Sequence, residues 1–392
     1  MSKQSAVSSQ RFFHSRWVEA PADVEELDPA ELAPGFRAAG VACGLKDGGS
    51  TDLGLLTSEA ETVASALLLT RNAAAAAPVR VCRQDCDPNA IRAAVVNSGN
   101  ANAATGEQGY ADALAIRAAA AEALDVEPRS VAVAETGTIG VPLAVDAVRR
   151  GIAEASGALS ERGGDDFARA IVTTDRAPKR CTVRANGVTV SAQAKGAGMI
   201  EPGFATMLCF VQTDAAVADP AAALRGAVDR SFERITVDGQ LSTNDTVLLQ
   251  ASGASGEPLP EGLLDAVLLQ LALEVVGDGE GATRTARVAV SGAASAPEAH
   301  RVARAVANSP LVKTALYGRD PNWGRVAQAA GMALAGEELD ELGSGEIDAA
   351  ELGSDSAEAE LSVRLGRGGA SAHVYFCDLT PGYVELNSAY TS

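Results

Sequence analysis

One stretch of the chain places a threonine where a glycine-rich loop leads into an apolar run. It reads Lys195-Gly-Ala-Gly-Met-Ile-Glu-Pro-Gly-Phe-Ala-Thr-Met-Leu-Cys-Phe210, and the threonine is Thr206. Such a junction can hold a backbone carbonyl against a hydroxyl, and a threonine that begins a newly cut chain can use its own α-amine as general base. That amine titrates at about pH 8, so part of it is unprotonated at neutral pH. Thr206 is therefore a candidate nucleophile, although an ordinary strand threonine has the same local sequence.

Familiar cofactor and metal patterns are absent from the sequence. The run Gly277-Asp-Gly-Glu-Gly281 has the spacing of neither a dinucleotide-binding motif nor a phosphate-binding loop. The 6 cysteines form no CxxC pair and there are only 3 histidines, so zinc-ligand spacing is missing. Cys82 and Cys86 can meet on one helical face, but the flanking sequence offers no further ligands. We expect no metal or organic cofactor, and we interpret the cysteines as reduced packing residues.

Helices and short strands must position these residues. Apolar residues at mixed three and four spacing predict helices over residues 110–124, 143–158, 220–232, 261–276 and 297–307. Valine-rich runs predict strands over residues 93–96, 131–134, 182–184, 188–191, 207–212, 287–290, 360–364 and 372–376. Asn186-Gly187 is a type I′ hairpin signal between two of them. Runs of helices and antiparallel strands favour a layered α+β architecture over a doubly wound sheet.

The sequence gives weaker indications of local structure in three other segments. The Gly- and Ser-rich residues 251–256 and the acidic residues 337–358 are expected to be surface connections. The run Tyr383-Val-Glu-Leu near the end of the chain is expected to be a docked strand rather than a frayed tail. None of the three has the character of a domain linker.

Length and composition limit the class of protein. The 392 residues are enough for two packed lobes, and 47% hydrophobic with 21% charged residues is typical of a globular protein with a real core. The formal net charge of -19 argues against nucleic acid, whose binding depends on Lys and Arg. The first seventeen residues have no apolar signal-peptide core, and no run of 18 apolar residues occurs, so we expect a cytoplasmic protein without a membrane partner.

Residues 195–210 resemble the self-cleavage motif of the ArgJ family, and further blocks match that family in the same order. The resemblance runs from about Gly35 to the last residue. The other matching blocks cover residues 97–106, 136–140, 170–175, 242–245, 278–283, 320–325 and 382–392.

The resemblance implies a function and a division of the chain. Members of this family cut themselves at the Ala-Thr bond, which here joins Ala205 and Thr206. The products would be an alpha chain, residues 1–205, with the N-terminal part of a large lobe, and a beta chain, residues 206–392, with the nucleophile and a smaller C-terminal lobe. The implied fold is the layered αββα architecture of ArgJ- and DmpA-like proteins. The implied reaction is acetyl transfer from N-acetylornithine to glutamate in arginine biosynthesis, without a cofactor, in an assembly of two alpha and two beta chains.

Roles are carried over from the family only where residues match. Thr206 takes the nucleophile position, and Thr136 with Gly137 take the oxyanion-hole positions. The substrate-binding positions are matched by Thr173, Lys195, Thr206, Glu280, Asn387 and Ser392. Thr173 rather than Thr174 follows only from counting along the motif.

Several departures from the family pattern and three alternatives accompany this interpretation, and Glu135 is the most important departure. Glu135 stands where relatives commonly have serine, and a carboxylate beside Thr136 would oppose a developing oxyanion. On a strand its side chain would point away from that of Thr136. Acetyl-CoA is a second candidate donor. The alternative functions are an N-terminal-nucleophile hydrolase, in which water takes the acyl group, and a non-catalytic amino-acid-binding relative.

Overall fold

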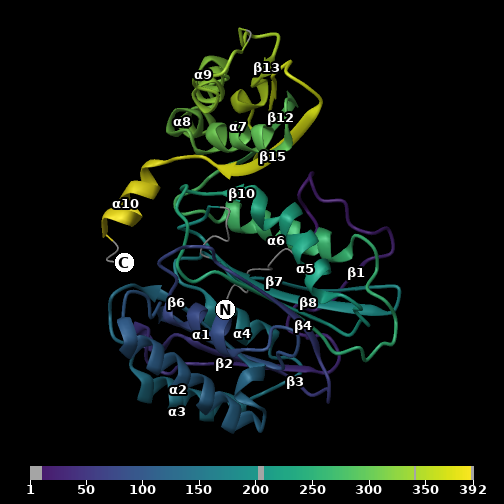
Figure 1. The fold of residues 1–392 in the computed structure, drawn as a ribbon, viewed down its shortest axis with the longest axis vertical. Coiled ribbons are helices and arrows are strands. Elements are labelled where there is room, and N and C mark those ends of the chain that lie inside the picture. Colours follow the sequence, from purple (N-terminus) through teal and green to yellow (C-terminus); the bar gives the residue numbers. More distant parts are fainter. Residues whose placement is uncertain (1–10, 202–206, 340, 390–392) are drawn as a thin grey trace, which may run out of the picture.

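The computed structural model describes residues 11–201, 207–339 and 341–389. The chain forms two lobes, a large one that contains two sheets and a small one built on a third sheet (Figure 1). Helices lie against all three sheets, and most neighbouring strands are antiparallel. The predicted α+β class is therefore confirmed.

The first sheet of the large lobe has six strands in the order β1-β7-β8-β9-β11-β4. The strands are β1 Glu25–Glu26, β7 Lys179–Ala185, β8 Val188–Lys195, β9 Leu208–Thr213, β11 Thr246–Ala251 and β4 Ala64–Leu69. Strands β9 and β11 are parallel, and every other neighbouring pair is antiparallel. The hairpin between β7 and β8 turns at Asn186 and Gly187, whose φ angles of 50° and 79° fit the predicted type I′ turn. This sheet places Lys195 opposite Leu208, at the edge where β9 begins.

The second sheet of the large lobe has four strands in the order β2-β3-β5-β6. They are β2 Phe36–Val41, β3 Leu53–Ser58, β5 Ala93–Asn100 and β6 Val131–Thr138. Strands β5 and β6 are parallel, and their regular pairing breaks down between Gly99 and Asn100. The disturbed end of this pair carries Thr136 and Gly137.

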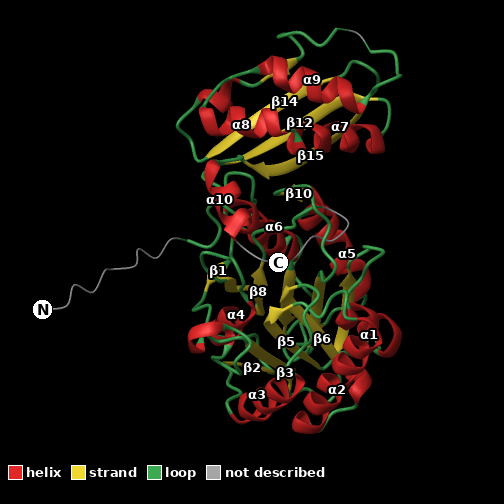
Figure 2. Ribbon diagram, turned by 90° about the vertical axis from the view of Figure 1, so that its left-hand side faces the viewer, coloured by secondary structure: helices red, strands yellow, loops and turns green. Residues whose placement is uncertain are grey.

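Six helices pack on these two sheets. They are α1 Ala77–Asp85, α2 Gly106–Leu124, α3 Val145–Gly157, α4 Gly164–Ile171, α5 Pro220–Arg230 and α6 Leu263–Gly277. Helices α5 and α6 cover one face of the six-stranded sheet (Figures 1 and 2). Helix α4 contacts both sheets, and the ring of its Phe167 packs edge-on against Phe210 of β9 with centroids 5.3 Å apart. Helices α1, α2 and α3 contribute buried side chains to the core of the four-stranded sheet.

The small lobe contains a five-stranded sheet in the order β10-β15-β12-β14-β13. Its strands are β10 Ile235–Thr236, β15 Ala370–Cys377, β12 Thr285–Ala293, β14 Glu358–Arg364 and β13 Ile347–Asp348. Helices α7 Ala296–Asn308, α8 Pro310–Gly318 and α9 Trp323–Ala333 pack against it. Helix α10 Pro381–Ala389 follows β15 and runs beside the large lobe (Figure 1).

The five helices and eight strands predicted from periodicity and composition are found, with ends shifted by a few residues. Two expectations are wrong. Residues 383–386 lie in helix α10, not in a docked strand, because Pro381 is fixed in a conformation suited to the first turn of a helix. The acidic residues 337–358 are only partly a surface connection, because Ile347 of β13 and Leu352 are buried in the small lobe.

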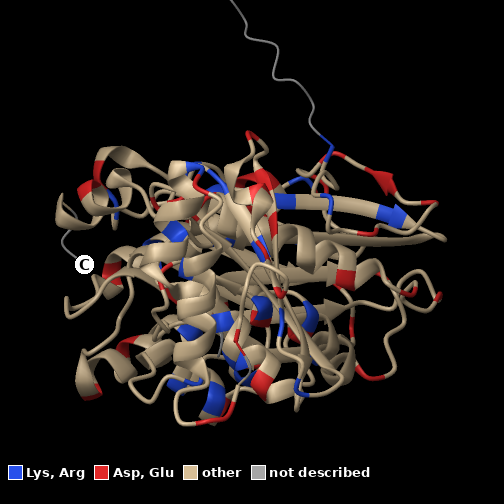
Figure 3. Ribbon diagram, turned by 90° about the horizontal axis from the view of Figure 1, so that it is seen from above, with Lys and Arg blue, Asp and Glu red and all other residues tan. Residues whose placement is uncertain are grey.

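The surface carries both signs of charge. Figure 3 shows Lys and Arg interspersed with Asp and Glu along the ribbon. In the described ranges, no helix is both long enough and apolar enough to cross a bilayer.

Candidate functional site

A cavity of about 160 Å³ lies where the ends of β6 and β8 meet the loops that follow α4 and α6. It is lined by Thr136, Gly137, Thr173, Thr174, Lys195, Gly198, Met199, Asp238, Gln240, Glu280, Tyr383 and Asn387. Six of these residues were predicted from the sequence as site residues, and they come from segments far apart in the chain. Thr173 and Thr174 both line the cavity, so its lining does not choose between them.

The end of β6 is shaped by a close approach of two backbones. Gly137 has φ +132°, and a Cβ atom there would lie 2.3 Å from the carbonyl carbon of Gly99 on β5. Only glycine fits this position. The neighbouring Thr136 is buried, and its Oγ1 accepts a hydrogen bond of 3.2 Å from Lys195 Nζ. Because Oγ1 is the acceptor in that bond, the hydroxyl proton of Thr136 can be donated elsewhere.

Lys195 is a buried cation in the wall of the cavity. Lys195 is 2% exposed, and this burial lowers the pKa of its ammonium group. The negative charges of Asp175, Asp245 and Glu280 oppose that shift. A lysine buried among carboxylates is suited to hold an anionic group that enters the cavity.

The buried side chain of Asp175 ties three segments together. It accepts hydrogen bonds from the backbone N–H groups of Thr173 at 3.1 Å and Gly196 at 2.7 Å, and from Lys179 Nζ at 2.6 Å. Burial alone would raise the pKa of Asp175, but Lys179 and Lys195 together hold it below its usual range. The carboxylate therefore fixes the Thr173 loop against the end of β8.

Glu280 and Asn387 form the opposite side of the cavity. Asn387 Nδ2 on α10 donates to Glu280 Oε2 at 2.8 Å, and the Glu280 N–H donates to Ala197 O at 3.0 Å. A Cβ atom at Gly198 would lie 2.7 Å from the Glu280 carboxyl group, so the glycine leaves room for it. The cavity thus has a cation on one wall and a carboxylate on the other, which is complementary to an amino acid.

Three predicted site residues, Ala205, Thr206 and Ser392, lie outside the described residues. The described chain resumes at Met207, whose N–H donates to Asp245 Oδ1 at 3.2 Å. Sequence reasoning assigned no role to Asp175, Asp238, Asp245 or Tyr383. Asp175 and Asp245 do end two of the matching blocks, which was the available signal.

Glu135 does not place a negative charge beside the cavity at neutral pH. It is fully buried, and burial raises the pKa of its carboxyl group to about 8. It also precedes Thr136 on a strand, so the two side chains point to opposite faces. The nearby side chain of Asn102 partly offsets this rise.

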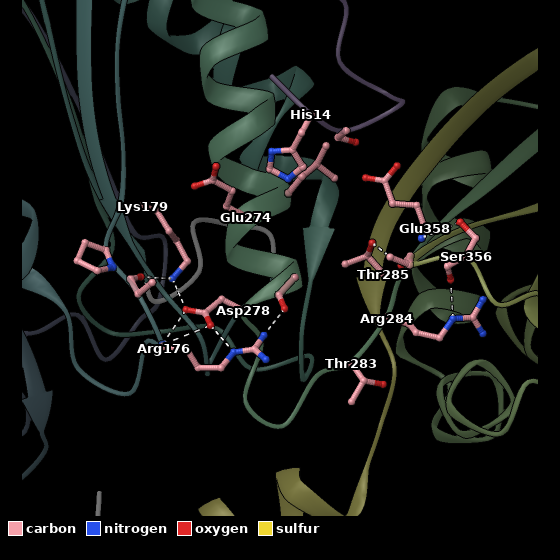
Figure 4. A pocket seen from close by; sticks show the side chains of 16 residues that line it. His14, Arg176, Lys179, Glu274, Asp278, Thr283, Arg284, Thr285, Ser356 and Glu358 are labelled. Atoms are coloured by element: carbon pink, nitrogen blue, oxygen red, sulfur yellow. Dashed lines mark hydrogen bonds and ion pairs between the residues drawn. The ribbon is translucent and has the colours of Figure 1, made fainter. Parts of the chain in front are cut away.

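A larger cavity of about 720 Å³ lies between the two lobes (Figure 4). Its cations already have partners: Arg176 Nε and Lys179 Nζ each lie 2.6 Å from Asp278, and Arg284 donates to the carbonyl oxygens of Leu316 and Leu352. Lys179 also forms an ion pair with Asp175, so it connects the wall of this cavity to the loop of the smaller one. In the part of the chain that the structure describes, no group of three His, Cys, Asp or Glu residues is placed to hold a metal ion.

Comparisons with known proteins match almost the whole chain. The family model described as "ArgJ family" matches residues 37–392. A protein named arginine biosynthesis bifunctional protein ArgJ from Symbiobacterium thermophilum is 45% identical over 94% of this chain and 100% of its own. A protein of the same name from Mycolicibacterium paratuberculosis is 43% identical over 98% of this chain and 99% of its own.

One solved structure is also similar to part of the chain. It is an ornithine acetyltransferase from Mycobacterium tuberculosis complexed with ornithine, 39% identical over 46% of this chain and 98% of that chain, with a TM-score of 0.43. The family match over residues 37–392, together with relatives that align from end to end, shows that this chain belongs to the ArgJ family.

Proposed function

We propose that this protein transfers an acetyl group from N-acetylornithine to glutamate and so produces ornithine and N-acetylglutamate for arginine biosynthesis. The observation that carries the proposal is the single small cavity in which Thr136, Gly137, Lys195, Glu280 and Asn387 meet. The end-to-end relatives, which carry the name of an arginine biosynthesis protein, support the same function.

We propose that the chain first cuts itself between Ala205 and Thr206. The hydroxyl of Thr206 attacks the carbonyl carbon of Ala205, the peptide bond breaks, and water hydrolyses the resulting ester. The products are an alpha chain of residues 1–205 and a beta chain that begins with Thr206. The six- and four-stranded sheets and their helices would then be the layered αββα fold of ArgJ- and DmpA-like proteins, formed by both chains.

The transfer itself follows as a two-step exchange through an acetyl ester. The hydroxyl of Thr206 attacks the acetyl carbonyl of N-acetylornithine, its proton passes to the freed α-amine, and ornithine leaves with that proton. The amine of glutamate then attacks the ester and releases N-acetylglutamate. The hydroxyl of Thr136 and the N–H of Gly137 would stabilise the oxyanion in both steps, by about 3 to 4 kcal/mol per donor in other acyl-transfer enzymes.

The walls of the cavity fit the substrates by charge. Lys195 is assigned to the substrate carboxylate, and Glu280, oriented by Asn387, is assigned to the ammonium group. Thr173 and Ser392 would complete the substrate-binding set. No step needs a metal or an organic cofactor. The pairing of two alpha with two beta chains and the location in the cytoplasm stay predictions of the sequence.

The central test compares wild type with Thr206→Ala and Thr206→Val. Purified wild type should separate into two chains on a denaturing gel, and both variants should run as one chain of 39.8 kDa without acetyl transfer. Transfer of acetyl groups by intact Thr206→Val at the wild-type rate would rule out the proposal.

Two further assays separate the alternatives. A hydrolase would release acetate from N-acetylornithine as fast without glutamate as with it, whereas a transferase would form ornithine in step with N-acetylglutamate. Acetyl-CoA supplied with glutamate tests the second donor.

A further inference from the structure

The loop between β2 and β3 is organised by the carboxylate of Asp52. Asp52 is fully buried, and its two oxygens accept hydrogen bonds of 2.6 to 3.1 Å from four consecutive backbone N–H groups, those of residues 43–46. Burial alone would raise the pKa of Asp52, but hydrogen bonds from this loop hold it below its usual range. One buried side chain therefore fixes the course of the backbone in this loop.

The same loop packs directly on the end of β5. A Cβ atom at Gly99 would lie 2.9 Å from Leu45 O, so the loop carbonyl occupies the space beside the glycine. A Cβ atom at Gly137, on the neighbouring strand β6, would lie 2.7 Å from Gly99 Cα. The loop therefore supports the backbone that shapes the proposed oxyanion hole.

Lys46 extends from this loop to the segment that carries Thr173. Its side chain is half-buried, and its Nζ donates to Thr51 O at 3.0 Å and to Val172 O at 2.7 Å. Taking an ammonium group out of water costs free energy unless it is hydrogen-bonded, so these two bonds hold Nζ in place. Lys46 thus ties the loop to the residue immediately before Thr173.

The segment that carries Thr173 is anchored on both sides of that residue. Val172 O is held by Lys46, and the Thr173 N–H donates to the carboxylate of Asp175 at 3.1 Å. Thr173 itself lines the substrate cavity. We propose, building on the proposed function, that Lys46 is a positioning residue that fixes the Thr173 segment relative to the oxyanion hole and so sets the affinity for substrate.

The charge of Lys46 acts on the same region. Burial lowers the pKa of its ammonium group, Asp52 and Asp175 raise it, and Lys195 lowers it. Lys46 therefore lies close enough to interact with Lys195, the cation assigned to the substrate carboxylate, and with the Asp175 anchor. Replacement by a neutral residue would remove both the tether and this charge, whereas arginine would keep a charged donor.

The test compares full-length Lys46→Met and Lys46→Arg with wild type. Methionine leaves the backbone bonds to Asp52 and the packing of Leu45 in place, so self-cleavage should be complete and kcat should stay within about threefold of wild type. KM for N-acetylornithine, and the Kd of ornithine by calorimetry, should rise by about threefold to thirtyfold, because the Thr173 segment loses one anchor. Lys46→Arg should restore most of the affinity.

The matched control is Arg364→Met. The Nη2 of Arg364 also donates to a backbone carbonyl, Gly345 O at 2.8 Å, but in the small lobe, so KM and Kd should stay at the wild-type values. If Lys46→Met does not fold, Lys46→Gln is the second variant. Glutamine is uncharged and one bond shorter than lysine, so the same two constants should rise, to a smaller degree.

The outcomes are distinct. A rise in KM and in the Kd of ornithine in Lys46→Met, with recovery in Lys46→Arg, supports the proposal. Unchanged KM and Kd in Lys46→Met overturn it. A lower Tm with equal losses of affinity in the methionine and arginine variants also overturns it, because it would indicate a structural role only. Failure of the proposed function would show in wild type itself, as an uncut chain or as transfer that does not need Thr206.

Discussion

Burial decides the charge of individual residues around the candidate site. Lys195, Glu135 and Asp245 are all buried, and in each case burial shifts the pKa toward the neutral form. For Glu135 this removes the difficulty that the sequence posed, because a carboxyl group with a pKa of about 8 is mostly protonated at neutral pH. A glutamate beside Thr136 is thus compatible with oxyanion stabilisation, and we expect it to make the stability of the protein sensitive to alkaline pH.

Glu135→Gln should remove that sensitivity. The folded-state pKa is raised above the unfolded value of 4.5, so stability is fully present below pH 4.5 and is lost as the pH rises toward about 8. Over that window wild type should lose about 1.4 kcal/mol per pH unit relative to the variant. Urea unfolding at pH 6, 7 and 8 measures the difference, with the exposed Glu122→Gln as control. Parallel curves for wild type and Glu135→Gln would contradict the prediction.

At the scale of elements, the end of β6, which pairs with β5, forms one wall of the cavity. The register of these strands shifts at Gly99 and Asn100, and the backbone of Gly137 approaches that of Gly99 too closely for any side chain. The shape of this wall therefore depends on backbone packing, while Lys195 at the end of β8 contributes the charge.

Gly137→Ala should damage activity far more than a glycine substitution nearby. Its Cβ would collide with the Gly99 backbone and displace the end of β6, with a loss of about a hundredfold to a thousandfold in kcat for acetyl transfer. Gly140→Ala is the control, because Gly140 also has positive φ but a Cβ atom there would meet no other atom within 4 Å. It should cost about 1 to 2 kcal/mol of stability and leave kcat near wild type. Equal activity of the two variants would show that the close approach does not matter.

At the scale of the whole molecule, local sequence patterns predicted where helices and strands occur better than which residues the fold brings into contact. Five helices and eight strands were found from periodicity and composition, whereas helices α1, α4, α8, α9 and α10 and strands β1 to β4, β10, β11 and β13 were not predicted as such. Strands β3 and β11 are buried on both faces and lack the alternation of a half-exposed strand, and with at most one valine each they also lack the composition that indicated the other strands. The site residues Lys195, Glu280 and Asn387 could be identified through the family motifs. Asp175 and Asp245 could not be given a role, because their function depends on backbone groups that only the folded chain brings to them.

An ion network lies where the chain leaves the large lobe for the small one. Asp278 follows α6, where the chain leaves the large lobe for β12, and Lys179 Nζ lies 2.6 Å from it (Figure 4). The same Nζ lies 2.6 Å from Asp175. The same lysine therefore connects the segment between the lobes with the loop that carries Thr173. A change at Lys179 should affect the stability of the molecule and substrate binding together.

Lys179→Met tests this connection. It keeps much of the side-chain volume but leaves two carboxylates without their shared cation, which costs about 3 to 5 kcal/mol for a buried pair. We expect Tm to fall by roughly 5 to 10 °C and KM for N-acetylornithine to rise severalfold, because the Thr173 loop loses its anchor. Arg162→Ala is the control, since Arg162 pairs with Asp28 and Glu31 on the surface, and it should leave both quantities unchanged. A lower Tm with an unaltered KM would show that Lys179 has a structural role only and that the ion network does not affect substrate binding.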